Sequence, residues 1–517
     1  MTDTERLARA AAVYKACRID DRLYAMNPYL TQQNFYAQQL RALALVEVIE
    51  DLHLEPGRRN VIVVGAGIAG RTLAAGFAAV GAPVQLVDSR EQPFERYRDA
   101  IHRELHPNII FWPAQDPVPT TALPFLNWAQ APAKQVVEEL IEEWDESFGR
   151  KVRMVFGEAI AVTSYGDSVN VELADGGILT ANICVLATGF KDERVFGSLR
   201  SPSYWSPSAI SDQESTVLVS GSGDGGLIDV LSPILGTDVT RAAHKLATSL
   251  RDSPLKKDIA EIEARREAAR IGGTRDSADP CLFYANVPIP PDAAQELEKF
   301  LRSKQKLVNR EIVFVHKSTS PYSYTAAPIN KLLLGHFSSP PRPIVQSIRG
   351  SLRQVGTKHE LHAEGGAYQE LDPPAGYEKT VVRHGADPGV KDILDAAQLQ
   401  ALQQQSDENP EAANIEGYNR KLFQWNETGM GKSGVRPSIM PRMLRRALGQ
   451  VGKVYSIDMQ VGPIEIDAFR KKLPIYVELT QKDRIKAEEL RLFPLKIGPA
   501  TVDIGRVVYR RNRPDEE

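Results

Sequence analysis

Two glycine-rich stretches have the residue types and the spacing needed to bind a nucleotide. The first, "VIVVGAGIAG", runs from Val61 to Gly70, and the second, "VLVSGSGDGG", runs from Val217 to Gly226. Each is an apolar run that ends in the spacing G-x-G-x-x-G. In a dinucleotide site the first glycine allows a tight turn, the second lets the backbone touch a pyrophosphate, and the third lets the next helix pack against the strand. The N-terminus of that helix offers free N–H groups to the phosphates.

The first stretch has the fuller set of features. Its glycines are followed by an Ala- and Gly-rich helical pattern and then by a short apolar run, "VQLVD", which ends in Asp88. An acidic side chain at that place can accept hydrogen bonds from the hydroxyl groups of a ribose. We therefore predict a dinucleotide site here. The residues assigned to it are Gly65, Ala66, Gly67, Ile68, Ala69, Gly70, Asp88, Ser89 and Arg90.

The second stretch supports two interpretations. Its spacing fits a nucleotide cradle, and it equally fits a plain turn from a strand into a helix. The apolar run "STVLVS" precedes it, which favours the nucleotide. The following "GTDVTRAAHK" offers both Asp238 and Arg241 as readers of the ribose, so the choice between NADH and NADPH stays open. The candidate residues at the turn are Gly221, Gly223, Asp224 and Gly226.

The elements that must position these turns are those of an α/β fold. Each stretch predicts a buried strand, a glycine turn and a helix. Between the two, "AIAVTSYGDSVNVELADG" predicts short antiparallel strands with turns near Gly166 and Gly176. Helical spacing dominates residues 1 to about 56, and the last 70 or so residues alternate strand and helix patterns. An apolar strand, "NICVL", ends in the three residues Ala187, Thr188 and Gly189.

Taken in order, "GAGIAG", the short strands, "VLATGF" and "GSGDGG" resemble the two-dinucleotide-binding-domain flavoproteins. This superfamily includes flavin-containing monooxygenases, N-hydroxylating monooxygenases and pyridine-nucleotide reductases. The resemblance covers roughly residues 58–345. It implies that the first fingerprint and the A-T-G turn (Ala187, Thr188 and Gly189) bind FAD and that the second fingerprint binds NAD(P)H. Asp224 facing the flavin instead of the nicotinamide is an alternative for the second turn.

Two departures from that superfamily narrow the activity. Cys17, Cys184 and Cys281 form no C-x-x-C pair, which argues against a dithiol disulfide reductase. The Baeyer–Villiger pattern F-x-G-x-x-x-H is absent between the fingerprints, because the nearest stretch, "VFGSLRSPSYW", has no histidine. A plain monooxygenase is therefore not the only assignment open.

We expect five segments along the chain. They are a helical N-terminal segment (1–57), a Rossmann-like FAD-binding domain with an inserted β-meander (58–216), an NAD(P)-binding unit (217–345), a return to the FAD domain with a helical connection (346–434), and a small α/β module (435–517).

Three other stretches resemble known motifs but lack a residue that each motif requires. Gly431-Lys432-Ser433 matches the end of a P-loop, but Asn426 stands where its first glycine is required. The pair His102 and His106 lacks the glutamate that a zinc peptidase needs next to the first histidine. A pair near residue 360, in "KHELH", lacks a third ligand. We therefore assign no metal site.

Three loops are candidates for contacting a substrate or the flavin, and a structural role remains open for each. No catalytic acid or base can be assigned. The candidate side chains are Arg103, His106, Trp112, Tyr204, Trp205, Asn330 and Lys331.

Composition and charge limit the kinds of partner expected for this protein. The chain has 517 residues, is 42% hydrophobic and 25% charged, and carries a net charge of −3, so neither nucleic acid nor a membrane is an expected partner. Its first residues show no apolar signal segment, from which we expect a cytoplasmic protein. Self-association is left open.

We therefore predict an FAD-dependent oxidoreductase that takes hydride from NAD(P)H and reduces oxygen or another small-molecule acceptor. The rival hypotheses are a non-catalytic FAD- or NAD(P)-binding regulatory or assembly protein and an enzyme that uses NAD alone. The N-terminal helices and the C-terminal module, which flavin chemistry does not require, keep the first rival open.

Overall fold

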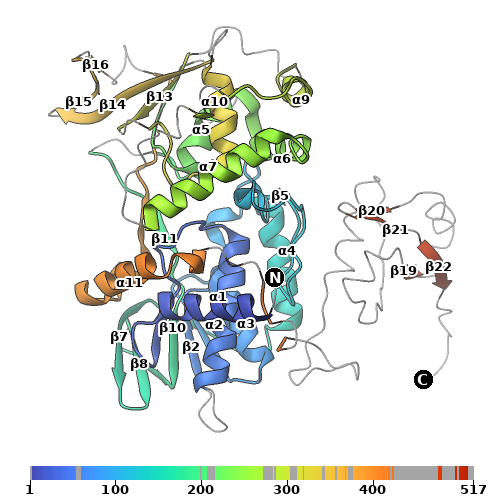
Figure 1. Ribbon diagram of the computed structural model, residues 1–517. Coiled ribbons are helices and arrows are strands. Elements are labelled where there is room, and N and C mark those ends of the chain that lie inside the picture. Colours follow the sequence, from blue (N-terminus) through green and yellow to red (C-terminus); the bar gives the residue numbers. More distant parts are fainter. Residues whose placement is uncertain are drawn as a thin grey trace.

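The computed structural model contains two α/β units, which Figure 1 shows stacked one above the other. The structure describes residues 3–53, 60–197, 201–206, 216–271, 283–284, 287–302, 311–317, 320–339, 344–355, 358–366, 368–370, 377–413, 415, 417–419, 422–423, 475–479, 495–497, 500–502 and 504–509.

The first unit is built on a parallel sheet with the strand order β1-β10-β2-β3-β6. The strands β2 and β10 are apolar runs, "VIVV" and "ICVL", that are buried along their whole length. Such runs are typical of parallel strands covered on both faces. One face packs on helices of the first unit, and the other packs on the meander. The elements are β2 (Val61–Val64), α3 (Ile68–Ala79), β3 (Val84–Asp88), α4 (Ala133–Ser147), β6 (Val152–Phe156) and β10 (Ile183–Leu186).

The N-terminal segment is part of this unit. Between its two helices, α1 (Asp3–Cys17) and α2 (Phe35–His53), lies the short strand β1 (Leu23–Ala25), which pairs in parallel with β10. Helices α1 and α2 contribute to the same apolar core as α3. Residues 1–57, expected to form a helical N-terminal segment, thus also contribute a strand that extends the sheet of the first unit.

The β-meander has the predicted form. Strands β7 (Ala159–Tyr165), β8 (Ser168–Leu173) and β9 (Ile178–Ala181) pair antiparallel in that order. Both predicted turns contain a glycine in the left-handed region, with φ of 56° at Gly166 and 86° at Gly176. A separate insertion after β3 contains η1 (Glu95–Tyr97), β4 (Glu104–Leu105), η2 (Ile109–Phe111) and β5 (Ala131–Pro132).

The second unit is a six-stranded sheet with the order β16-β15-β14-β13-β12-β17. Strands β12, β13, β14 and β17 are mutually parallel, and β15 and β16 extend the sheet antiparallel. This sheet continues to Val382, beyond the boundary expected at residue 345. Its strands are β12 (Thr216–Ser220), β13 (Glu311–His316), β14 (Val345–Val355), β15 (Lys358–Ala363), β16 (Tyr368–Glu370) and β17 (Lys379–Val382).

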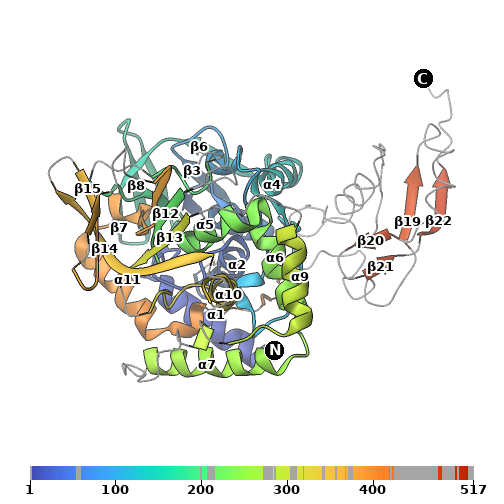
Figure 2. The same cartoon turned by 90° about the horizontal axis from the view of Figure 1, so that it is seen from above.

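Helices cover one face of this sheet, and Figure 2 shows α5, α6 and α9 on one side of β12 and β13. Val217 and Val219 belong to the helix-covered core, whereas Leu218 faces the opposite core. Alternate strand residues therefore reach both layers. The helices are α5 (Asp224–Leu235), η3 (Gly236–Asp238), α6 (Val239–Ser249), α7 (Pro254–Ile271), α9 (Pro291–Arg302) and α10 (Pro328–Ser338). The predicted α/β class with two Rossmann-like units is confirmed.

The chain then returns to the first unit. Strand β18 (Ala386–Pro388) pairs antiparallel with β11 (Phe190–Glu193), and η4 (Gly389–Asp392), α11 (Ala396–Glu408) and η5 (Pro410–Ala413) follow. Near the C-terminus, β19 (Ile475–Leu479) pairs in parallel with β22 (Ile504–Tyr509), and β20 (Leu495–Ile497) pairs antiparallel with β21 (Ala500–Val502). The stretch Gly431-Lys432-Ser433 lies outside the described residues. Of the described helices, none has the length and apolarity to cross a membrane.

Candidate functional site

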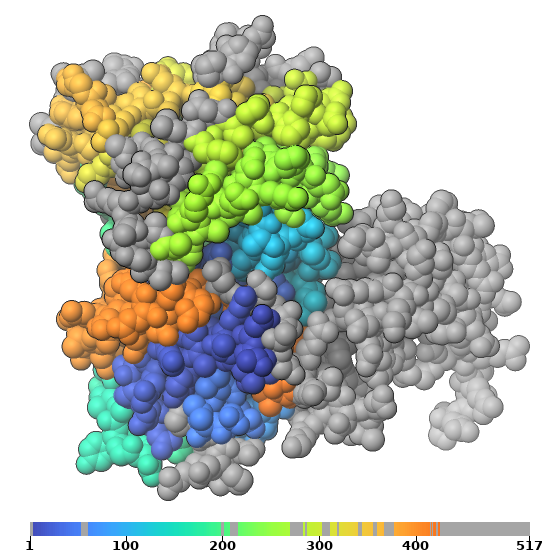
Figure 3. Space-filling model, in the orientation of Figure 1, coloured from blue at the N-terminus to red at the C-terminus, as the bar shows by residue number. Residues whose placement is uncertain are grey.

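A cavity of about 1420 Å³ lies at the carboxyl ends of the first sheet and is walled by both units. Ligands of open α/β sheets bind at these strand ends. The volume exceeds the range of about 300–1,000 Å³ that is usual for a single small ligand. On the face seen in Figure 3, α7 lies across the junction of the two units. The predicted residues that line the cavity are Gly65, Ala66, Gly67, Ile68, Ala69, Asp88, Ser89, Arg90, Ala187, Thr188, Gly189 and Asp224.

At the first glycine turn, backbone packing requires glycine at positions 65 and 70 but leaves room for a side chain at Gly67. Gly65 has a φ of 102°, and a Cβ atom there would lie 2.4 Å from the carbonyl oxygen of Ala187. A Cβ atom at Gly70 would lie 1.7 Å from the carbonyl oxygen of Gly65. Gly67, by contrast, has an ordinary φ of −71°, and a Cβ atom there would meet nothing within 4 Å.

The second turn repeats this arrangement. Gly221 has a φ of 143°, and its Cβ atom would lie 2.2 Å from the carbonyl oxygen of Arg383. A Cβ atom at Gly226 would lie 1.9 Å from the carbonyl oxygen of Gly221. Gly223 again has an ordinary φ, −82°, and open space beside it. The two turns therefore have the same backbone requirements. Gly221, Gly223 and Gly226 are not lining residues of the cavity, whereas Asp224 and Gly225 are.

Asp88 ties the first turn to the neighbouring strand. Its Oδ2 accepts a hydrogen bond of 2.5 Å from the backbone N–H of Ala66, and its Oδ1 accepts one of 2.8 Å from that of Arg90. The carboxylate thus lies beside the glycine turn on the cavity wall, where the sequence predicts a reader of the ribose.

The A-T-G turn packs between the first glycine turn and the returning chain. Gly189 has a φ of 66°, and its carbonyl oxygen accepts a hydrogen bond of 2.8 Å from the N–H of Gly389. The hydroxyl of Thr188 is buried and has no hydrogen-bond partner within the part of the chain that the structure describes. Because a buried polar atom is normally paired, this hydroxyl is available to a ligand in the cavity.

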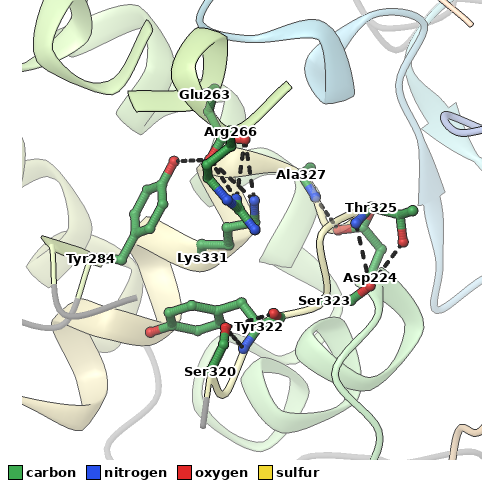
Figure 4. A network of polar contacts seen from close by, with 10 residues as sticks. All are labelled: Asp224, Glu263, Arg266, Tyr284, Ser320, Tyr322, Ser323, Thr325, Ala327 and Lys331. Carbon is green, nitrogen blue, oxygen red and sulfur yellow. Dashed lines mark hydrogen bonds and ion pairs between the residues drawn. The ribbon is translucent and has the colours of Figure 1, made fainter. Parts of the chain in front are cut away.

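Asp224 begins α5 and faces α10. Its Oδ1 accepts hydrogen bonds from the N–H of Ala327, at 2.9 Å, and from the side-chain amide of Asn330, at 2.8 Å. Figure 4 shows the bond to Ala327. Burial raises the pKa of this carboxyl group. Of the two candidates on α10, Asn330 lines the cavity and holds Asp224.

Lys331 has a structural environment. Its side chain is fully buried, and its ammonium group lies 3.1 Å from Glu263 of α7. The same carboxylate accepts hydrogen bonds from the hydroxyl of Tyr284, at 2.7 Å, and from Arg266, at 2.9 Å (Figure 4). Desolvation lowers the pKa of Lys331, and Glu263 opposes that shift. The network anchors α7 to α10 over the second turn.

Arg103 also proves to be structural. Its guanidinium group pairs with the buried carboxylate of Asp229 on α5, and Arg383 binds the other oxygen of that carboxylate at 2.7 Å. The ring of Tyr204 lies 4.3 Å from the guanidinium carbon of Arg103. The ion pair between Arg103 and Asp229 joins the insertion of the first unit to the second unit, and it lies away from solvent.

His106 lines the cavity at the same junction. Its Nε2 lies 2.7 Å from Nδ1 of His244, and its Nδ1 accepts hydrogen bonds from the N–H groups of Asn108 and Ile109. Burial, with His244 adding to it, lowers the pKa of His106 to about 3. The imidazole is therefore neutral at physiological pH, and its hydrogen bonds hold the junction.

Aromatic side chains form a continuous wall of the cavity. The ring centroid of Tyr97 lies 5.0 Å from that of Phe35 and 4.5 Å from that of Trp205. Trp205 in turn lies 4.9 Å from Tyr204, which approaches Gly225 of the second turn. All of these residues line the cavity, as does the predicted Trp112. The wall therefore runs from Phe35 to Gly225 of the second turn, and it suits flat aromatic rings.

Asp238 and Arg241, which were expected to contact the second ribose, do not lie at the end of a strand. Asp238 lies in η3 and Arg241 in α6. Strand β12 lies between β13 and β17, and in the sequence β13 follows only after the described helices α5, α6, α7 and α9. In the first unit the N–H of Gly65 donates a hydrogen bond to the carbonyl oxygen of Val87, and Asp88 is the next residue of β3. In the second unit the N–H of Gly221 donates to the carbonyl oxygen of Val315, and His316 is the next residue of β13.

His316 therefore occupies the place of Asp88, and Lys317 comes next. The signal was present in the sequence as the apolar run "IVFV" ended by two basic residues.

One protein-family model matches a segment of the first unit. The model of the 3-hydroxyacyl-CoA dehydrogenase NAD binding domain matches residues 60–111. No curated protein matches the chain. Among solved structures, the bacillithiol disulfide reductase Bdr (YpdA) from Staphylococcus aureus is 10% identical, with a TM-score of 0.34 and coverage of 65% of this chain and 78% of that one.

Thioredoxin reductase from Lactococcus lactis is 12% identical, with a TM-score of 0.34 and coverage of 69% and 99%. A cyclohexanone monooxygenase mutant from Rhodococcus sp. Phi1 is 13% identical, with a TM-score of 0.34 and coverage of 65% and 74%. Values this low say nothing about the activity of this chain. Its own two sheets and two glycine turns define the class, an α/β protein with two Rossmann-like units around one cavity.

Proposed function

We propose that the chain is an FAD-dependent oxidoreductase that binds FAD at the first turn and NAD(P)H at the second. Gly67 and Gly223 carry the proposal. The fold requires glycine at the other four fingerprint positions, because a Cβ atom there would collide with backbone atoms. At these two positions the protein itself leaves room for a side chain, so a ligand that touches the backbone accounts for the glycine.

The residues around the first turn fit FAD. The N-terminus of α3, whose N-cap residue Gly67 has no side chain, leaves backbone N–H groups for the pyrophosphate. Asp88 is placed for the adenosine ribose. The buried hydroxyl of Thr188 can pair with a polar atom of the cofactor. FAD bound there would supply two-electron redox chemistry, with the nicotinamide as hydride donor.

The chain's own part is to bring two flat rings together. The aromatic wall from Phe35 to Tyr204 gives the cavity a flat apolar surface against which such rings can pack. The ion pair between Arg103 and Asp229 and the contact between His106 and His244 fix one unit against the other. Such fixed geometry is what hydride transfer demands, because it lowers the entropic cost of alignment.

For the coenzyme we propose NADPH in preference to NADH. An acidic residue at the end of the second strand reads a free ribose diol, whereas a basic environment accommodates a 2′-phosphate. In the second unit that place is held by His316 and followed by the exposed Lys317.

One observation favours the rival, an FAD-binding protein without pyridine-nucleotide turnover. Asp224 already sets a half-buried carboxylate at the first position of α5, close to where the second pyrophosphate would lie. Like charges at short range oppose each other.

Anaerobic spectroscopy separates the hypotheses. Purified protein should be yellow, and NADPH should bleach the flavin absorbance without oxygen. A yellow protein that neither NADPH nor NADH bleaches would support the regulatory rival, and a colourless protein that cannot be loaded with FAD would refute the proposal.

A further inference from the structure

The loop between β1 and α2 forms one wall of the cavity. Strand β1 pairs with β10 so that Ala25 lies opposite Leu186, and the N–H of Met26 donates a hydrogen bond of 2.7 Å to the carbonyl oxygen of Leu186. The chain therefore leaves the sheet at the same edge as the A-T-G turn. The eight residues 28–35 all line the cavity.

The strand order shows which half of a dinucleotide this loop would meet. Asp88 ends β3, on one side of β2, whereas β10 and β1 lie on the other side. A pyrophosphate at the first turn with its adenosine at Asp88 directs the remaining half of the molecule over β10 toward β1. Two strand spacings separate β2 from β1, about 10 Å. That distance is within the reach of the flavin half.

Gln32 is the unusual residue of the loop. Its φ of 58° lies in the left-handed region, which non-glycine residues rarely adopt. Its Oε1 is buried and has no hydrogen-bond partner among the residues that the structure describes. The residue lines the cavity. Backbone strain together with an unpaired buried acceptor in a cavity wall indicates a ligand contact.

Hydrogen bonds from Arg41 and Gln33 hold this loop in place. Arg41, which is buried, donates hydrogen bonds to the carbonyl oxygens of Thr31, at 2.5 Å, and Ala412, at 3.2 Å. The side-chain amide of Gln33 donates to the carbonyl oxygen of Leu30 at 2.6 Å. These bonds fix the loop before any ligand arrives, which is the arrangement expected of a binding wall.

We propose that residues 28–34 form the wall that binds the isoalloxazine end of FAD and that the Gln32 amide contacts the edge of the ring. This inference rests on the proposed function. The pyrimidine edge of a flavin presents an N–H donor between two carbonyl acceptors, and a primary amide offers the complementary acceptor and donor. The N-terminal segment thereby completes the cofactor site.

The test compares the affinity of the full-length apoprotein for FAD with its affinity for ADP, which carries only the adenosine half and phosphates. Gln32→Gly removes the side chain, and glycine adopts the same backbone conformation without strain. We expect its Kd for FAD to rise about tenfold, equivalent to about 1.4 kcal/mol, while its Kd for ADP changes less than about twofold. Gln32→Glu, which cannot donate, should also weaken FAD binding selectively.

Asp88→Ala serves as the matched variant for the other half of the molecule and should weaken FAD and ADP alike. An unchanged Kd for FAD in Gln32→Gly would overturn the inference while leaving the proposed function intact. An equal loss of FAD and ADP affinity would overturn it as well, because the loop would then act on the whole site. If wild-type protein binds ADP but no FAD, both proposals fall.

Discussion

At the first glycine turn the carboxylate of Asp88 comes from the neighbouring strand and accepts a hydrogen bond from Ala66. At the second turn the corresponding strand ends in His316, and the carboxylate nearby is Asp224 of the helix itself, which bonds to α10. The glycine geometry of the two turns is the same. In the proposed function, the shared backbone geometry sets where a dinucleotide would lie at each turn, whereas the residues beyond the turn would select which dinucleotide binds.

The strongest test of the shared geometry compares two sets of glycine substitutions: those at glycines that the fold requires and those at glycines beside open space. Gly70→Ala and Gly226→Ala would bring a Cβ atom within 1.7 Å and 1.9 Å of a carbonyl oxygen, so each should destabilise the apoprotein by about 3 kcal/mol or more. Gly67→Ala and Gly223→Ala should cost much less, about 1 kcal/mol or less, because the space beside both N-cap glycines is open and only the N-cap preference against alanine is lost. Urea unfolding of the apoproteins measures both; equal effects at all four positions would contradict the comparison.

A second prediction makes the second turn resemble the first. His316→Asp places an acid where Asp88 stands in the first unit, so it should repel a 2′-phosphate and accept hydrogen bonds from a free diol. The ratio of kcat/KM for NADPH to that for NADH should fall about tenfold or more, equivalent to about 1.4 kcal/mol. Lys317→Ala should lower the ratio less. Arg241→Ala, at the position first expected to read the ribose, is the control, and a larger effect there would refute the assignment.

The third prediction concerns the carboxylate that distinguishes the second turn. Burial raises the pKa of Asp224 above its ordinary value of 3.8, so the unfolded chain releases this proton at a lower pH than the folded protein does. Its contribution to stability is therefore present below about pH 4 and declines as the pH rises through the raised pKa.

Asp224→Asn cannot ionise, so its unfolding free energy relative to wild type should increase as the pH rises from 4 to 7. Chemical denaturation at several pH values measures the trend. A flat difference for Asp224→Asn would mean that the half-buried carboxylate is fully compensated.

The smallest effect is expected from the cysteines. Burial raises the pKa of Cys17 to about 11 and raises that of Cys184 as well, so neither thiol forms a thiolate readily. Replacing Cys17, Cys184 and Cys281 together by serine should leave flavin reduction unchanged, with Cys184→Ala as the control for placing a hydroxyl in a buried strand. Loss of turnover in a folded triple variant would indicate a redox role for a thiol.

Local patterns were sufficient for the parts of the site that are continuous in sequence. The glycine turns, Asp88, the A-T-G turn and the meander all follow from apolar runs and turn residues a few positions apart. Other parts depend on contacts between distant segments. Strand β1 has only three residues, too few for a strand pattern. His316 was missed because a long stretch of sequence, which includes the described helices α5, α6, α7 and α9, separates β13 from the turn that it adjoins. Arg103 meets Asp229 only through the packing of the two units.

The central claim, that both turns bind nucleotides, is tested most directly by anaerobic stopped-flow absorbance of the flavin in Gly67→Val and Gly223→Val. A side chain at either position projects into the space left open beside the backbone. Gly67→Val should yield colourless protein. Gly223→Val should remain yellow and be reduced by dithionite, but its reduction by NADPH should slow by orders of magnitude. If Gly223→Val were reduced by NADPH as fast as wild type, the second turn would be only a link between a strand and a helix.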